Sequence, residues 1–265
     1  MDKFARIEAQ KQWNTTACGE LSGDKESLSY FKKVEEDRYK IQNWTHDYFE
    51  YSKTAGKKVL EIGVGQGTDI LQFGKNGAIC TGIDITDQHL ELTAKNFKVH
   101  GLNIELIKAD ATKLPFPDNH FDIVHSFGVI HHIPEAKEVL KEVSRVLKKG
   151  GKAYVTMYYK YSAFFIFWKV LAHGIRHLWF LKKGIAGTLS TIEEGADGIN
   201  IKPYVKMYSK GDMKKLFKNF TIEDLSIKQL RSDHFWPSFL ESFMKPLVKR
   251  LDSKLGWYIV CKARK

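Results

Sequence analysis

The sequence contains little of what marks a secreted or a membrane-spanning protein. Only 3 of its 265 residues are cysteines, and they are widely separated, without the paired spacing of a metal site: Cys18, Cys80 and Cys261. Free thiols are typical of a reducing compartment, and no metal site is predicted. Residues 1–6 contain no apolar targeting core. We therefore expect a cytoplasmic protein.

The sequence also lacks the motifs of phosphate-binding turns, although it contains a glycine-rich turn. The apolar residues 58–62 predict a buried parallel strand, and glycine follows at every second position, at Gly63, Gly65 and Gly67. A dinucleotide turn needs a further glycine where Thr68 stands, and a phosphate loop needs a Gly-Lys-Ser/Thr end that is absent. The carboxylate of Glu61 would repel a pyrophosphate. The turn therefore favours a cationic, phosphate-free ligand.

Carboxylates close the next two expected strands. Residues 78–84 end at Asp84, 17 residues after Gly67, and the expected strand 104–109 is followed by Asp110. Open α/β sheets bind ligands beyond the carboxyl ends of their strands, where a carboxylate can accept hydrogen bonds from both hydroxyls of a ribose. The alternative is a solvated strand end, as surface acids usually are. Because both acids fall on the expected ligand edge, we favour a nucleoside.

Successive blocks of this sequence resemble those of the class I S-adenosylmethionine-dependent methyltransferases. They lie between about residue 56 and residue 159 in the order 61–67, 82–85, 109–111, 114–122, 129–133 and 142–151. The ordered run is more specific than any single block. The resemblance implies an α/β fold with a Rossmann-like, seven-stranded, mostly parallel sheet and helices on both faces. It also implies S-adenosyl-L-methionine as the cofactor and S-adenosyl-L-homocysteine as the product.

The resemblance implies a role for each matching residue. The turn after the first strand would face the methionine part of the cofactor, the end of the second strand its ribose and adenine, and the end of the third strand the adenine edge. The segment after the fourth strand would lie near the sulfonium. In this order, the implied cofactor-binding residues are Glu61, Gly63, Gly65 and Gly67; Asp84 and Ile85; Asp110 and Ala111; and Ser126 and Phe127.

Two neighbouring histidines are the candidate catalytic residues. A sulfonium carries an activated methyl group, so catalysis rests mainly on aligning the acceptor and excluding water. A base is needed only where the acceptor must lose a proton. His131 and His132 follow the fourth strand, where this family has its active site, and we favour His131. The alternative, that the pair only supports the loop, stays open. His125, inside the strand, is expected to be a packed structural residue.

The basic charge is confined to one part of the chain. We expect an N-terminal helical cap over 1–55 with a helix at 27–51, a core over 56–159, an inserted helical lid over 160–208, and a completion of the sheet over 209–265. Residues 1–159 contain 22 basic and 22 acidic side chains, whereas residues 160–265 contain 20 and 9, so the second part holds the whole net charge of +11. Such an excess suits an anionic substrate, an acidic membrane or nucleic acid, unless its lysines serve only solubility.

The lid begins with an aromatic, basic stretch at 162–183, in which four basic side chains recur at helical spacing. These charges argue against a spanning helix. Two interpretations remain, a lid over the active site and an interfacial helix on anionic lipid, and we favour the lid. A second amphipathic stretch, 234–251, is expected to pack largely on the sheet. Together the two stretches favour a hydrophobic or aromatic acceptor.

The function indicated is methyl transfer to a small organic acceptor at oxygen, nitrogen or carbon. Two alternatives stay open. The excess lysines suit methylation of RNA or another macromolecule, although the sequence has neither a base-stacking motif nor an Asn/Asp-Pro-Pro-Tyr/Phe motif. A noncatalytic cofactor-binding subunit that activates a partner is the other alternative, and the complete set of glycines and acids argues against it.

Overall fold

The computed structural model describes residues 10, 13, 14, 19–166, 178, 181, 182, 184, 187, 188, 191, 204–230 and 241–265. Most of the predicted 162–183 helix and the first part of the 234–251 stretch lie outside these residues. The helices and strands are α2 (Leu28–Gln42), α3 (Trp44–Tyr48), η1 (Tyr51–Lys53), β1 (Lys58–Ile62), α4 (Thr68–Lys75), β2 (Ile79–Asp84), α5 (Asp87–Val99), β3 (Glu105–Lys108), β4 (Phe121–Phe127), η2 (Ile130–His132), α6 (Ala136–Val146), β5 (Leu147–Tyr158), α8 (Lys210–Leu216), β6 (Thr221–Lys228), α9 (Glu241–Leu255) and β7 (Tyr258–Arg264).

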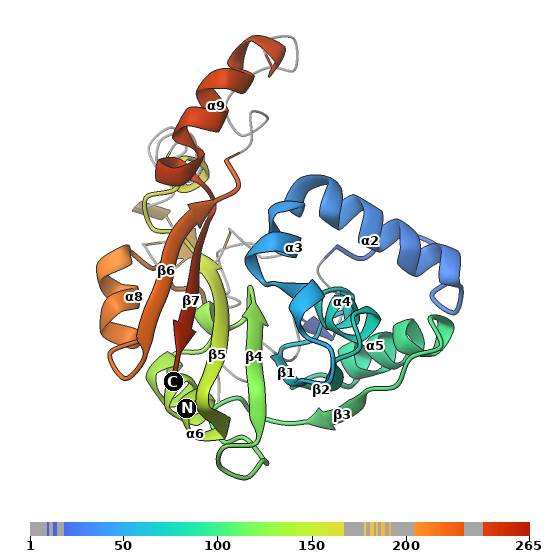
Figure 1. The fold of residues 1–265 in the computed structure, drawn as a ribbon. Coiled ribbons are helices and arrows are strands. Elements are labelled where there is room, and N and C mark those ends of the chain that lie inside the picture. Colours follow the sequence, from blue (N-terminus) through green and yellow to red (C-terminus); the bar gives the residue numbers. More distant parts are fainter. Residues whose placement is uncertain are drawn as a thin grey trace.

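One seven-stranded sheet organises the described residues, with the strand order β3-β2-β1-β4-β5-β7-β6 (Figure 1). Strands β1 to β5 pair in parallel, and β7 runs antiparallel to both of its neighbours. The chain order reverses between β1 and β4, which is the switch point where open α/β sheets bind ligands. The predicted Rossmann-like, mostly parallel sheet is confirmed.

Helices cover both faces of the sheet because both faces are apolar. On one face, α6 buries Val139, Leu140 and Val143 in a cluster that also contains Met213 of α8. The spacing of these α6 residues forms one stripe of a helix. On the other face, α4 and α5 contribute to a second cluster around Phe73 and Phe97. Strand β1 is therefore buried from both sides, which explains its continuous apolar run.

The helix predicted over 27–51 is broken into α2, α3 and η1. The break lets Phe49 enter the core, where it is fully buried, and places Glu50 in a left-handed conformation with φ of 53°. There the Glu50 carboxylate accepts a hydrogen bond from Tyr154 at 2.6 Å and pairs with Lys152 at 2.6 Å and Lys262 at 3.1 Å. These contacts come from strands distant in sequence, which local periodicity does not register.

The sequence predicts a fifth strand over residues 152–159, and β5 begins earlier, at Leu147. Leu147 already pairs with Phe121, and the register then shifts before Lys152 pairs with Ile123. The glycine pair between these positions forms the irregularity, with φ of 77° at Gly150. The predicted segment is thus only the regular part of a longer strand.

Helix α9 extends beyond the end of the sheet (Figure 1). It packs beside β6, and Asp252 near its end accepts a hydrogen bond from the backbone N–H of Leu230 at 2.5 Å. Of the apolar leucine and valine side chains of the 234–251 stretch that the structure describes, Leu247 is exposed, whereas Val248 and Leu251 are partly buried. Among the described residues, helices long and apolar enough to cross a bilayer are absent.

Candidate functional site

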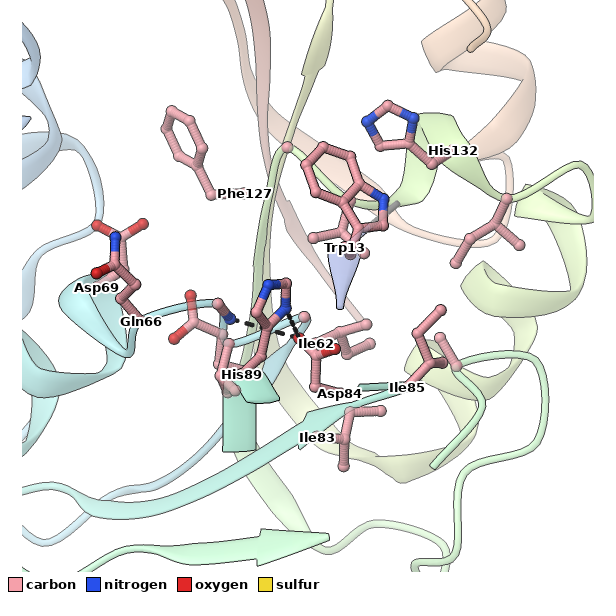
Figure 2. A pocket seen from close by; sticks show the side chains of 18 of the residues that line it. Trp13, Ile62, Gln66, Asp69, Ile83, Asp84, Ile85, His89, Phe127 and His132 are labelled. Carbon is pink, nitrogen blue, oxygen red and sulfur yellow. Dashed lines mark hydrogen bonds and ion pairs between the residues drawn. The ribbon is translucent and has the colours of Figure 1, made fainter. Parts of the chain in front are cut away.

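A pocket lies at the carboxyl edge of the parallel strands (Figure 2). Its walls come from the end of β1 and the turn after it, the ends of β2 and β4, and the segments after β3 and β4. Trp13 and residues of α2, α4 and α5 complete them, together with single residues of β5 and β7. All but two of the predicted cofactor residues line it: Glu61, Gly63, Gly65, Asp84, Ile85, Asp110, Ala111 and Phe127. The structure therefore brings together side chains that the sequence places on separate strands.

Gly67 and Ser126 do not line the pocket. A Cβ at Gly67 would lie 2.8 Å from the Thr93 side chain, so this glycine permits close packing of the start of α4 on α5. The Ser126 hydroxyl is buried and donates to the backbone oxygen of Ile62 at 3.1 Å. Both residues support the pocket wall from behind.

Gly65 leaves open space beside the backbone of the turn. Its φ is 55°, in the left-handed region that favours glycine, and a Cβ placed there would meet no atom within 4 Å. A side chain at this position would thus project into open space at the pocket. The turn leaves room for a ligand against its backbone, which fits the predicted cofactor.

Asp84 is a buried, well-ordered acceptor at the end of β2. One of its oxygens accepts from the backbone N–H and the hydroxyl of Thr86, both at 3.0 Å. The other lies 3.2 Å from Nδ1 of His89 and 3.4 Å from the backbone N–H of Gly65, as Figure 2 shows. Because a carboxylate ribose partner needs a fixed orientation, this set of donors fits the implied role.

His89 lines the pocket and was missed by the sequence reasoning. It belongs to the first turns of α5, whose start is capped by Thr86. The signal that could have found it is a histidine five positions after the strand-ending acid, where the first helical turn faces back to the strand. Asp110 also lines the pocket and accepts from the backbone N–H of Thr112 at 2.9 Å.

Beneath the turn lies a buried network of charges. Glu61, 2% exposed, lies 3.0 Å from Nδ1 of His125, which is fully buried as predicted. Asp69 forms an ion pair with Arg38 of α2 and accepts from the Tyr39 hydroxyl at 3.0 Å. Burial raises the pKa of the Glu61 carboxyl, although His125 acts against this shift. Burial also opposes ionisation of Asp69, but Arg38, His125 and the Tyr39 hydroxyl together outweigh it, and the pKa of Asp69 is lowered.

The same network contains residue types that also bind metal ions. Glu61, Asp69 and His125 each offer one ligand atom, and these atoms lie within 4.8 Å of one another. The guanidinium of Arg38, however, already supplies positive charge to Asp69 through two nitrogens. The arrangement is that of a structural ion-pair network, which the sequence reasoning did not predict because Arg38, Asp69 and His125 lie far apart along the chain.

Aromatic rings form an arc along the other part of the pocket. Phe127 lies 5.0 Å from Tyr258 between ring centroids, and Tyr258 lies 5.9 Å from Tyr158. His132 continues the arc at 6.2 Å from Tyr158 and 5.4 Å from Trp13. Figure 2 shows Trp13 beside His132 and, apart from them, Asp84 with His89. The arc offers an apolar, polarisable surface next to the nucleoside-type acceptors.

The two candidate catalytic histidines occupy different places. His132 lines the pocket, and its Nδ1 lies 2.9 Å from the carbonyl oxygen of Tyr204, which can only accept a hydrogen bond. His131 is fully buried against Tyr158, with 3.9 Å between ring centroids, and is not part of the pocket wall. Burial, followed by the neighbouring His132, holds the pKa of His131 well below its usual value. The geometry therefore favours His132 over His131.

The N-terminal part of the chain lies over the turn. Gln10 donates to the carbonyl of Ile85 at 3.1 Å, and the Tyr30 hydroxyl donates to Gln66 at 2.9 Å. Trp13 lines the pocket directly. These contacts close one side of the pocket.

Comparisons with known proteins agree with this site. Residues 60–155 match the family described as methyltransferase domain. An uncharacterized methyltransferase, YcgJ of Bacillus subtilis, is 33% identical over 106 residues, which are 40% of this chain and 42% of that protein. The ubiquinone/menaquinone biosynthesis C-methyltransferase UbiE of Azotobacter vinelandii is 35% identical over 113 residues, 40% and 44% of the two chains. The chain thus spans less than half the length of these two relatives.

Solved structures show the same fold. The [4+2]-cyclase SpnF covers 93% of this chain and 86% of its own, with 20% identity and a TM-score of 0.58. A methyltransferase from Methanosarcina mazei covers 82% and 96%, with 19% identity and a TM-score of 0.57. Residues 60–155 match a methyltransferase domain, and the described sheet is Rossmann-like. More particularly, the fold of this chain is that of a solved S-adenosylmethionine-dependent methyltransferase.

Proposed function

We propose that the protein transfers a methyl group from S-adenosyl-L-methionine to a small, hydrophobic or aromatic acceptor at oxygen, nitrogen or carbon. The observation that carries this proposal is a pocket in which the nucleoside edge of the sheet and an arc of aromatic rings face the same space. The first wall suits the cofactor and the second suits an apolar acceptor placed beside it.

The chain's own residues bind and orient the cofactor. Asp84 accepts from the ribose hydroxyls, while Ile85, Asp110 and Ala111 hold the adenine. Glu61 and the backbone of the glycine turn hold the methionine part. When bound, the cofactor supplies an activated methyl group, so these residues need only align it with the acceptor. Trp13 and the N-terminal cap exclude water from the pocket.

His132 serves as the base where the acceptor must lose a proton. The Tyr204 carbonyl holds Nδ1 as a donor, so Nε2 is the nitrogen that takes up the proton. His131, which lies behind the wall, acts through packing on Tyr158 rather than by contact with the acceptor.

The names of other relatives support an apolar acceptor and leave its reacting atom open. They include a sterol 4-C-methyltransferase of Caenorhabditis elegans, a fatty-acid O-methyltransferase of Mycolicibacterium smegmatis and a phosphatidylethanolamine N-methyltransferase of Cereibacter sphaeroides. We also propose that the protein is cytoplasmic and that its residues 162–183 contact an anionic membrane surface. The described residues that support this contact are the exposed Leu178, Leu181 and Lys182.

Cofactor binding is tested by thermal unfolding with S-adenosylhomocysteine. At about 100 times the dissociation constant, the ligand should stabilise the protein by about 2.7 kcal/mol. The variant Asp84→Asn should lose this shift, whereas Asp87→Asn, which removes a mostly exposed acid three positions away, should keep it. An unshifted wild type at saturating ligand would contradict the proposal.

Methyl transfer itself needs a separate test, because the similarity to a cyclase shows that the fold alone does not define the reaction. Small-molecule extracts incubated with cofactor labelled in its methyl group should yield a labelled, organic-soluble product. The same incubation with RNA or with a protein extract should yield none. Label only in RNA would instead support the macromolecular alternative.

A further inference from the structure

The described end of α9 is exposed and basic. Lys249, Arg250 and Lys254 are all exposed; Arg250 and Lys254, four residues apart, lie on one side of the helix, and Lys249 lies about 100° around the axis from Arg250. The single acid among residues 246–255, Asp252, is only partly exposed and is turned to the body, where it accepts from the N–H of Leu230. The charged side chains that are exposed among residues 246–255 are therefore all basic.

Exposed leucines accompany these cations. Leu247, on α9 itself, is 44% exposed, and in the inserted region Leu178 and Leu181 are 52% and 83% exposed, with the exposed Lys182 next in sequence. Exposure of a leucine side chain to water is unfavourable. A helix that combines apolar and basic side chains is typical of the interface between water and lipid. A nucleic acid would match the charges but would give these leucines no apolar environment.

The end of helix α9 and the start of the insertion both meet the sheet beside the pocket. The insertion leaves the sheet at Tyr159, whose N–H donates to the carbonyl of Trp257 at 2.9 Å, directly after α9. The next residue, Tyr258, and its partner in β5, Tyr158, both line the pocket. A surface that contacts α9 therefore lies at the same edge of the sheet as the aromatic arc.

We propose that α9 docks the protein on an anionic lipid surface through Lys249, Arg250 and Lys254, with Leu247 entering the apolar boundary. The three cations would contact lipid phosphates. The docking needs no cofactor and holds whether or not methyl transfer is demonstrated. It would place the pocket edge near the bilayer, from which an apolar acceptor could enter.

The test uses the full chain with phosphatidylcholine vesicles that contain about 30% phosphatidylglycerol, at about 150 mM salt. The triple variant Lys249→Glu, Arg250→Glu, Lys254→Glu should bind the vesicles about 100-fold more weakly than the wild type in sedimentation. The matched control is Lys210→Glu, Lys214→Glu, Lys215→Glu, which makes the same change in net charge at exposed positions of α8. It should retain most of the binding.

Three outcomes would overturn the proposal. They are an absence of wild-type binding, an equal loss in both triple variants, which would indicate net charge alone, and tighter α9-dependent binding to an RNA oligonucleotide than to the vesicles. The S-adenosylhomocysteine shift should be unchanged in both variants, which shows that they are folded. A failure of vesicle binding with an intact shift therefore leaves the proposed cofactor binding and methyl transfer standing.

Discussion

At the scale of the residue, Asp84 owes its fixed orientation to its neighbours. Thr86 follows Asp84 in the same loop and Gly65 belongs to the turn after β1, whereas the contact at 3.2 Å from His89 comes from a side chain on α5. Replacing His89 with Leu removes this hydrogen-bond donor and leaves the Asp84 carboxylate less fixed in the free protein. Ligand binding must then also restrict the carboxylate, which lowers the affinity. We expect S-adenosylhomocysteine to bind about tenfold more weakly, which calorimetry would measure. His100→Leu, at the other end of α5, should bind normally, and unchanged affinity in His89→Leu would contradict this role.

His131 makes the stability of the protein sensitive to acid. Both of its ring nitrogens are buried and have no hydrogen-bond partner among the described residues, and burial holds its pKa well below 6.5 in the folded state. The unfolded chain therefore binds a proton near pH 6.5 that the folded chain does not bind. Stability from this residue is complete above that pH and falls by up to about 1.4 kcal/mol per pH unit below it.

Replacing His131 with Phe should flatten this acid dependence. The variant keeps a ring against Tyr158 but has no group to protonate. Urea unfolding between about pH 4.5 and 7 should show a smaller loss of free energy than in the wild type. His120→Phe, at a partly buried site, serves as the control and should keep the wild-type slope. Equal slopes in wild type and His131→Phe would contradict the assignment.

At the scale of the element, Glu50 ties the N-terminal helices to the sheet. Its carboxylate is held by Lys152 of β5, Lys262 of β7 and the Tyr154 hydroxyl. We expect Glu50→Gln to lower the free energy of unfolding by about 1–2 kcal/mol, because a partner of several cations is lost. Glu138→Gln, which removes an exposed i,i+3 pair with Lys141, should change it by less than about 0.5 kcal/mol. Denaturant titration of both variants measures the difference.

The same element shows where sequence reasoning succeeded and where it could not. Strands β1 and β2 were predicted within one residue, because apolar runs ended by glycine or acid are local signals. The break before Glu50 was missed, since it depends on Phe49 and Glu50 meeting β5 and β7. For the site, the cofactor edge was predicted from motif residues. Arg38 was missed because its partner Asp69 becomes a neighbour only in the folded chain.

At the scale of the whole molecule, the pocket is assembled from both ends of the chain. It is lined by Trp13 near the N-terminus and by Tyr258 near the C-terminus, with the glycine turn between them. A ligand that fills the pocket therefore adds contacts that must break before the N-terminal segment separates from the core. Binding should be seen as protection of that segment, in addition to a rise in overall stability.

Limited trypsin digestion tests this coupling, because Lys11 precedes Trp13 by two positions in the sequence. Saturating S-adenosylhomocysteine should slow cleavage after Lys11 by a factor that rises with ligand concentration, as expected for opening that excludes the ligand. Cleavage at Lys249 and Lys254 on the exposed face of α9 should be unaffected, which separates protection at the pocket from inhibition of the protease. In Asp84→Asn the protection at Lys11 should disappear. Equal cleavage with and without ligand in the wild type would show that the N-terminal segment does not close on the bound ligand, even if the melting temperature rises.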